Sequence, residues 1–205
     1  MSVKIPVSIS SRTTFKRKFT FLELYRSFVF VPRAMAKLIK NNKTELVEKE
    51  FIERIQLAIT EVNGCAACSY QHTKMALKMG MSNEEIGSFL TGDQCYIKEE
   101  ENKGILFAQH FADEKGIVKP YAIDVIIEAY GKEESEIILA AAQVMLAGNM
   151  YGIPLSAFQS RIKGKPFTDS TLVYEIGMML FGFLVLPFAI IHGVLDSIIR
   201  RIFKF

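Results

Sequence analysis

The sequence has little of what secreted, disordered or nucleic-acid-binding proteins contain. Its 205 residues include three Cys, an odd number that is too small for a disulfide-stapled secreted domain. There is no Trp, there are only six Pro, and half of the residues are hydrophobic, which excludes a disordered or low-complexity chain. The net charge of +3 offers no concentrated basic surface for a nucleic acid. We therefore expect a folded protein with no nucleic-acid partner.

No targeting segment stands out near the N-terminus. The alternating residues Val3, Ile5, Val7 and Ile9 form the one strand-like stretch, residues 3–9. This stretch contains Lys4 and Pro6 and is far shorter than the apolar region of a signal peptide. Together with the low cysteine content, this favours a reducing, cytoplasmic location.

Basic residues are concentrated at the N-terminus. Residues 1–50 contain eleven Lys or Arg against four Glu, and we treat residues 1–19 as a basic N-terminal segment. Its densest run comprises Arg12, Lys16, Arg17 and Lys18. Phe15 and Phe19 lie within this run, so it could contact an anionic membrane surface; the alternative is a solvated approach to the first long helix.

The fold is predicted to be all-α. From about Phe19 to Ser160, apolar residues recur at three- and four-residue steps, as amphipathic helices require. Pro32 should close or kink the first helix, and Asn63-Gly64 should end the second. A capping box at Ser82 and Glu85 should start another helix. Further helices are expected at about 65–79, 83–92, 98–114, 120–130 and 133–149, with stops at Gly80, Gly92 and Gly131.

The C-terminal region, residues 166–205, has a different character. Residues 176–195 contain no Asp, Glu, Lys or Arg, and their length as a helix is close to the thickness of a bilayer core. This run is a candidate membrane anchor; the alternative is an apolar helix buried in an oligomer. Its orientation in a membrane is undecided, because three basic residues precede it and three follow it.

One constellation carries chemistry. Cys65 and Cys68 form a Cys-x-x-Cys pair at an expected helix start, and His72 follows one turn later on the same face. The free N–H groups at a helix N-terminus favour thiolate over thiol. If the flanking helices fold back at Asn63-Gly64, Glu53 meets His72 and can orient its imidazole. The spacing thus predicts a dithiol beside a carboxylate–imidazole proton relay.

This spacing resembles a known family. The motif is similar to the signature of the alkylhydroperoxidase D-like, peroxidase-related branch of the carboxymuconolactone decarboxylase family. It consists of Glu53, eleven intervening residues, Cys65, two residues, Cys68, three residues and His72. Three further features resemble the family at similar places: Gly80 to Ile86, Leu90 to Asp93, and a later helix that ends near Asn149. The resemblance covers about residues 20–165, which we take as the helical domain, and leaves the apolar tail unexplained.

The resemblance implies an all-α bundle that assembles as a homotrimer or hexamer and reduces hydroperoxides with an external thiol or dithiol. In that scheme Cys68 attacks the peroxide and becomes a sulfenic acid, and Cys65 then condenses with it to a disulfide. His72, supported by Glu53, moves the protons. No cofactor or metal is implied. The candidate catalytic residues are therefore Glu53, Cys65, Cys68 and His72.

Other interpretations stay open at this point. A zinc site is disfavoured because Cys65, Cys68 and His72 supply only three ligands, and haem attachment fails because Ser69, not His, follows Cys68. A lactone decarboxylase needs a proton donor and acceptor but no dithiol. A membrane-tethered redox-sensing module would oxidise once without turnover. Cys95 is expected to be a packed or loop thiol.

Overall fold

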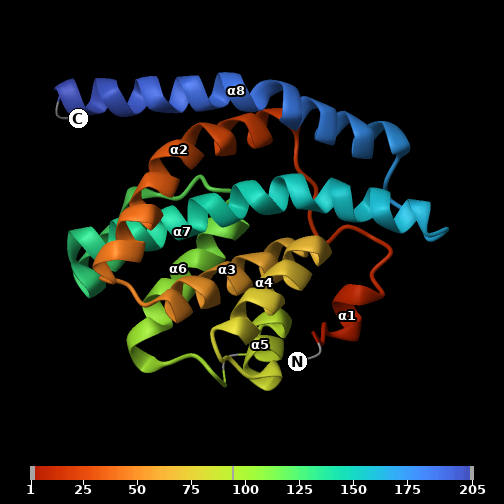
Figure 1. Cartoon of the computed structure of the whole chain (residues 1–205), viewed down its shortest axis with the longest axis horizontal. Helices are drawn as coiled ribbons and strands as arrows, with labels where there is room; N and C mark the ends of the chain where they lie inside the picture. The colour runs from red at the N-terminus through yellow and green to blue at the C-terminus, as the bar shows by residue number, and fades with distance from the viewer. Residues whose placement is uncertain (1–2, 94, 204–205) are drawn as a thin grey trace.

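The computed structural model describes residues 3–93 and 95–203, and within these ranges the chain is helical with no strand (Figure 1). The elements are α1 (Val7–Ser10), α2 (Phe21–Thr44), α3 (Lys49–Asn63), α4 (Ala66–Lys78), α5 (Asn83–Thr91), the 3-10 helix η1 (Glu99–Glu101), α6 (Asn102–Asp113), α7 (Pro120–Ile162) and α8 (Leu172–Phe203). The all-α prediction is confirmed. The strand-like interpretation of residues 3–9 is wrong, because Val7–Ser10 form a short helix instead.

Left-handed residues end the helices near the predicted positions. Gly64 ends α3 at φ 73° and Gly92 ends α5 at φ 77°, and glycine adopts such values without the penalty that a Cβ brings. The expected capping box of α5 is only half formed. Ser82 accepts a hydrogen bond from the Glu85 N–H, while the Glu85 carboxylate pairs with Arg54 of α3.

Two helices run further than predicted. The first does not close at Pro32: α2 continues through it to Thr44 and packs against both α7 and α8. Contacts along its whole length offset the one backbone hydrogen bond that proline removes. Gly131 interrupts α7 at φ 74° and ψ 169°, at the break predicted between two helices. The second part of α7 continues past Asn149 to Ile162.

The long helix α7 passes through the middle of the molecule, between α2 and the α3–α4 pair (Figure 1). Its side chains Ile138, Leu146 and Met150 are almost completely buried, as is Ile59 of α3. The α3–α4 hairpin is therefore held against a rigid central helix, which places the predicted site residues at the α3–α4–α7 junction.

The basic N-terminal run binds the protein's own surface. Lys16 pairs with Glu61, Arg17 pairs with Asp113, and Arg12 donates to the Gly64 carbonyl. Lys18 donates to the Asp169 carbonyl. These contacts fasten the N-terminal segment across the domain, while Lys16 and Lys18 remain exposed at its surface.

Two helices are long and apolar enough to cross a membrane. In α7, 72% of the apolar window is buried, as in the core helix of a soluble protein. In α8 only 22% is buried, and the helix continues through Pro187 along the outside of α2 (Figure 1). Length and composition therefore make α8 compatible with membrane association and do not locate the protein.

Candidate functional site

Glu53 and His72 meet across the α3–α4 hairpin, as the motif spacing predicted. Gly64 reverses the chain, and Glu53 Oε1 lies 2.8 Å from His72 Nδ1. Glu53 is buried and His72 is partly buried. A carboxylate at this distance accepts a hydrogen bond from Nδ1–H, which leaves Nε2 as the proton acceptor on the other side of the ring.

A buried polar network fixes the hairpin turn to α7. Asn63 Nδ2 donates to Asn149 Oδ1 over 3.1 Å, and Asn149 Nδ2 donates to Thr60 Oγ1 over 3.3 Å. All three residues are fully buried, where a lost partner would leave an unsatisfied polar group. The network therefore sets the position of α4 relative to α7, and it was not predicted from the sequence, which indicated only a helix end near Asn149.

Cys65 and Cys68 form a disulfide. Cys65 is completely buried and caps α4, since its sulfur accepts a hydrogen bond from the Cys68 N–H over 3.2 Å. Because Cys65 precedes the first residue of α4, the predicted row of three residues on one helix is reduced to Cys68 and His72. Cys68 is partly buried, so the two sulfurs differ in access.

α7 packs closely against the sulfurs. A Cβ added at Gly152 would lie 2.7 Å from both the Cys65 and the Cys68 Sγ atoms. Cys68 Sγ also lies 3.8 Å from the carbonyl oxygen of Gly148. Ser156, one turn further, accepts a hydrogen bond from the Ala67 N–H over 3.0 Å. These α7 contacts were missed by sequence reasoning, which had no signal linking α7 to the motif.

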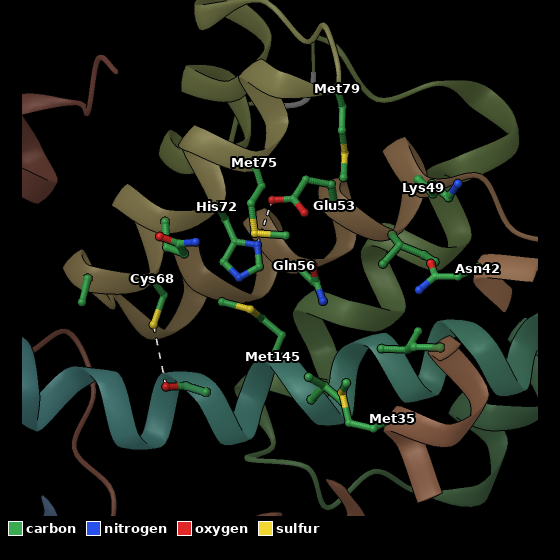
Figure 2. Close-up of a pocket in the computed structure, with 16 residues that line it drawn as sticks. Met35, Asn42, Lys49, Glu53, Gln56, Cys68, His72, Met75, Met79 and Met145 are labelled. Atoms are coloured by element: carbon green, nitrogen blue, oxygen red, sulfur yellow. Dashed lines mark hydrogen bonds and ion pairs between the residues drawn. The ribbon is translucent and has the colours of Figure 1, made fainter. Parts of the chain in front are cut away.

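Cys68, His72 and Glu53 line one cavity of about 570 Å³ between α2, α3, α4 and α7 (Figure 2). Most of its wall is apolar, and four methionines contribute to it: Met35, Met75, Met79 and Met145. Figure 2 shows the Cys68 sulfur and the His72 ring on the same side of this space, with Nε2 directed away from Glu53. Cys65 does not line the cavity.

Cys95 lies outside this cavity, on an exposed segment. Asp93 accepts a hydrogen bond from its thiol and adds a negative charge nearby, and both effects raise the pKa of Cys95 above its ordinary value. A raised pKa reduces the thiolate fraction and hence the reactivity toward peroxides. Of the two alternatives expected for Cys95, a packed or a loop thiol, this exposure supports the loop thiol.

Other parts of the described chain offer less for chemistry. Within residues 3–93 and 95–203, no group of three or more His, Cys, Asp or Glu side chains is arranged to hold a metal ion. A second cavity of about 620 Å³ lies between α2, α7 and α8 and contains His192 and Asp196. None of the four predicted site residues lines it.

The comparisons with known proteins bear on the family. No curated protein and no solved structure matched the chain. Residues 31–109 match the model of the carboxymuconolactone decarboxylase family. This range runs from α2 into α6 and contains Glu53, Cys65, Cys68 and His72, but neither α7 nor α8. Over residues 31–109, the chain is therefore similar to the carboxymuconolactone decarboxylase family.

Proposed function

We propose that the protein reduces hydroperoxides and is regenerated by an external thiol or dithiol. One observation carries this proposal: the Cys68 sulfur and the His72 ring line the same apolar cavity, and Cys65 stands behind Cys68 at bonding distance. An accessible thiol, a proton acceptor and a second buried thiol are the groups that a two-cysteine peroxide reaction uses.

In the first step, His72 Nε2 takes the thiol proton of Cys68, and the resulting thiolate attacks the terminal oxygen of the hydroperoxide. The O–O bond breaks, sulfur is oxidised to a sulfenic acid, and the alkoxide leaves as an alcohol after protonation by His72. Glu53 does not touch the reacting atoms. It is a positioning residue that holds Nδ1–H at 2.8 Å and stabilises the imidazolium between the two transfers.

In the second step, the Cys65 thiolate attacks the Cys68 sulfur. The S–O bond breaks, hydroxide leaves as water with the proton from the Cys65 thiol, and the disulfide described above is formed. A dithiol reductant then reopens this disulfide by thiol exchange at the accessible Cys68. Overall, one hydroperoxide and one dithiol become an alcohol, water and a disulfide.

The cavity wall favours substrates with an apolar body. Methionine and aliphatic side chains make up half of the lining residues and give it a largely apolar surface, while Asn42, Lys49, Gln56 and Gln71 add polar groups beside the site residues. Burying an apolar chain there gains free energy that hydrogen peroxide cannot. We therefore expect kcat/KM for a bulky organic hydroperoxide to exceed that for hydrogen peroxide.

Peptide mass mapping of the reduced protein after one equivalent of cumene hydroperoxide tests the reaction. We expect loss of two hydrogens within the peptide that contains Cys65 and Cys68. Cys65→Ser should stop at a Cys68 sulfenic acid that a dimedone-type reagent traps, and Cys68→Ser should lose turnover. Cys95→Ser is the matched control and should keep turnover.

Three results would contradict the proposal. An unreacted dithiol in the wild type would exclude peroxide chemistry at this site. Oxidation without turnover, when protein dithiols, dihydrolipoyl groups and small thiols are each supplied, would indicate a redox sensor. A lactone decarboxylase activity that is retained in Cys68→Ser would indicate that the protein is a decarboxylase.

A further inference from the structure

The outermost helix, α8, carries an apolar face that no other described residue covers. We call the outer stripe the six exposed residues Leu180, Leu184, Phe188, Ile191, Leu195 and Ile198 of α8. Their three- and four-residue spacing places them on one face, over a length of roughly 27 Å. Their exposed fractions lie between 47% and 69%. Soluble monomers rarely leave a continuous apolar surface of this kind in water, so the stripe requires a cover.

The opposite face of α8 is fitted closely to α2. Gly182, Ala189 and Gly193 are buried along it. A Cβ added at Gly193 would lie 2.0 Å from the carbonyl oxygen of Val29, so any larger residue there would push the helices apart. His192, the polar interruption of the apolar run, lies 3.1 Å from the Tyr25 hydroxyl of α2. α8 is therefore fixed along the domain (Figure 1).

This packing is incompatible with a membrane-spanning α8. A spanning α8 would carry the adjacent α2 into the hydrocarbon, including the exposed Arg26 and the Glu23–Lys115 ion pair. Charged groups at that depth are strongly disfavoured. A helix lying flat at the lipid surface, with the outer stripe downward, keeps α2 and the rest of the domain in water.

The charges at the two ends of α8 favour the same arrangement. Lys163 and Lys165 precede the helix and are exposed, whereas Arg161 is occupied by Glu175. Arg200, Arg201 and Lys204 follow the apolar run in the sequence. A spanning helix would separate these groups across the bilayer. A flat helix keeps Lys163 and Lys165 at the headgroups of the leaflet on which it lies, where anionic lipids attract them.

We propose that α8 docks the protein flat on an anionic lipid surface through the outer stripe, with the flanking cationic groups at the headgroups. The proposal is independent of the peroxidase reaction, since none of the outer-stripe residues lines the cavity at Cys68.

Flotation of the full chain with preformed vesicles tests the docking. Vesicles of phosphatidylcholine alone are compared with an equimolar mixture of phosphatidylcholine and phosphatidylglycerol. We expect the wild type to float with the mixture, and Leu184→Glu with Phe188→Glu to lower the bound fraction roughly tenfold or more. Leu106→Glu on α6, a residue 47% exposed, is the matched control and should bind like the wild type.

Lys163→Gln with Lys165→Gln should weaken binding to the anionic vesicles roughly fivefold per lysine at low salt. The outer-stripe variant should keep the wild-type circular dichroism spectrum, because both residues are exposed. An outer-stripe variant, Leu184→Glu with Phe188→Glu, that floats like the wild type would overturn the proposal. The proposal would also be overturned if neither the wild type nor Leu106→Glu bound to either kind of vesicle.

Two further readouts separate the other arrangements. A cysteine is introduced on either side of α8 in the sequence, by Thr168→Cys in one variant and Phe205→Cys in another. Each variant is treated with a membrane-impermeant maleimide outside sealed vesicles, and labelling is measured by peptide mass. Modification of both supports the flat helix, and protection of one shows a span and overturns it. The homotrimer or hexamer expected from the sequence could also cover the stripe: sedimentation to an oligomer that Leu184→Glu dissolves, without vesicle binding, would overturn the proposal.

Discussion

α7 and α8 have similar compositions and opposite environments. Both are apolar enough to cross a membrane, with mean hydropathies of 1.4 and 2.3, yet 72% of the first window and 22% of the second are buried. α7 is enclosed by α2, α3, α4 and α6, whereas α8 packs mainly on α2 and α7 and meets the N-terminal segment through Tyr174. Hydropathy thus indicates that the apolar surface of both helices should be shielded from water. The tertiary structure shows that the rest of the protein shields α7.

The chemistry follows this division. α7 supplies the backbone against which the two sulfurs rest, through Gly148 and Gly152, and it holds the hairpin turn through Asn149. α8 contributes no residue to the cavity at Cys68. Changes on the enclosed side should therefore affect catalysis and folding, while changes on the outer stripe should affect attachment.

The largest expected effect separates two histidines. His72→Ala removes the proposed proton acceptor, and we expect peroxide reduction to fall by about 10²–10⁴. His192→Ala on α8 is the matched control, because this residue contacts Tyr25 outside the site. Single-turnover oxidation of the reduced variants gives both rates. Equal losses in the two variants would show that the relay assignment is wrong.

Much of the enclosed side could be predicted from sequence because local chemistry determines it. Gly64, Gly92 and Gly131 take the left-handed φ values that their positions predicted, and the motif spacing brought Glu53 to His72. These features depend on a few neighbouring residues and on helical periodicity. Local rules are strongest where a turn admits almost only glycine.

The parts that sequence reasoning missed depend on contacts between distant segments. Pro32 does not end α2, because packing along α7 and α8 outweighs the lost hydrogen bond. Lys16 finds Glu61 across the fold, 45 residues away. No periodicity reports such pairings. The cover proposed for α8 is the extreme case, since no described part of the chain supplies it.

The second effect compares burial directly. Leu146→Ala on α7 removes a side chain that is 2% exposed, and we expect a loss of about 2–5 kcal/mol in the free energy of unfolding. Leu184→Ala on α8, which is 64% exposed, should change it by no more than about 0.5 kcal/mol. Urea unfolding in the same mild detergent measures both. A large loss for Leu184→Ala would mean that a second protein copy buries this face.

A third effect concerns two glycines of α7. Gly152→Ala places a methyl group against both sulfurs, and we expect overpacking to cost about 1–3 kcal/mol and to slow disulfide closure. Gly148→Ala meets no atom within 4 Å and should be neutral or stabilising by up to about 1 kcal/mol. Urea unfolding and the rate of Cys65–Cys68 disulfide formation check the pair. Equal behaviour would show that α7 does not press on the sulfurs.

The smallest effect lies where the two helices are joined. Arg161 at the end of α7 donates to both carboxylate oxygens of Glu175 at the start of α8, over 2.8 and 2.9 Å. These hydrogen bonds hold the pKa of Glu175 below its ordinary value of 4.5. As the pH falls, Glu175 is therefore protonated in the unfolded chain before it is protonated in the folded protein. The stability that the Glu175 carboxylate contributes is complete above about pH 4.5 and is lost as the pH falls to the lowered pKa of the folded state.

Glu175→Gln should accordingly cost about 1 kcal/mol at neutral pH, with the difference from the wild type shrinking as the pH falls below 4.5. Glu136→Gln removes a carboxylate that is 45% exposed and pairs with the partly buried Lys37, and as the control it should cost less than about 0.5 kcal/mol. Unfolding temperatures across this pH range measure the difference. A difference that stays constant in acid would show that Glu175 supports the α7–α8 junction by shape alone, and that its charge plays no part in holding the exposed helix to the enclosed one.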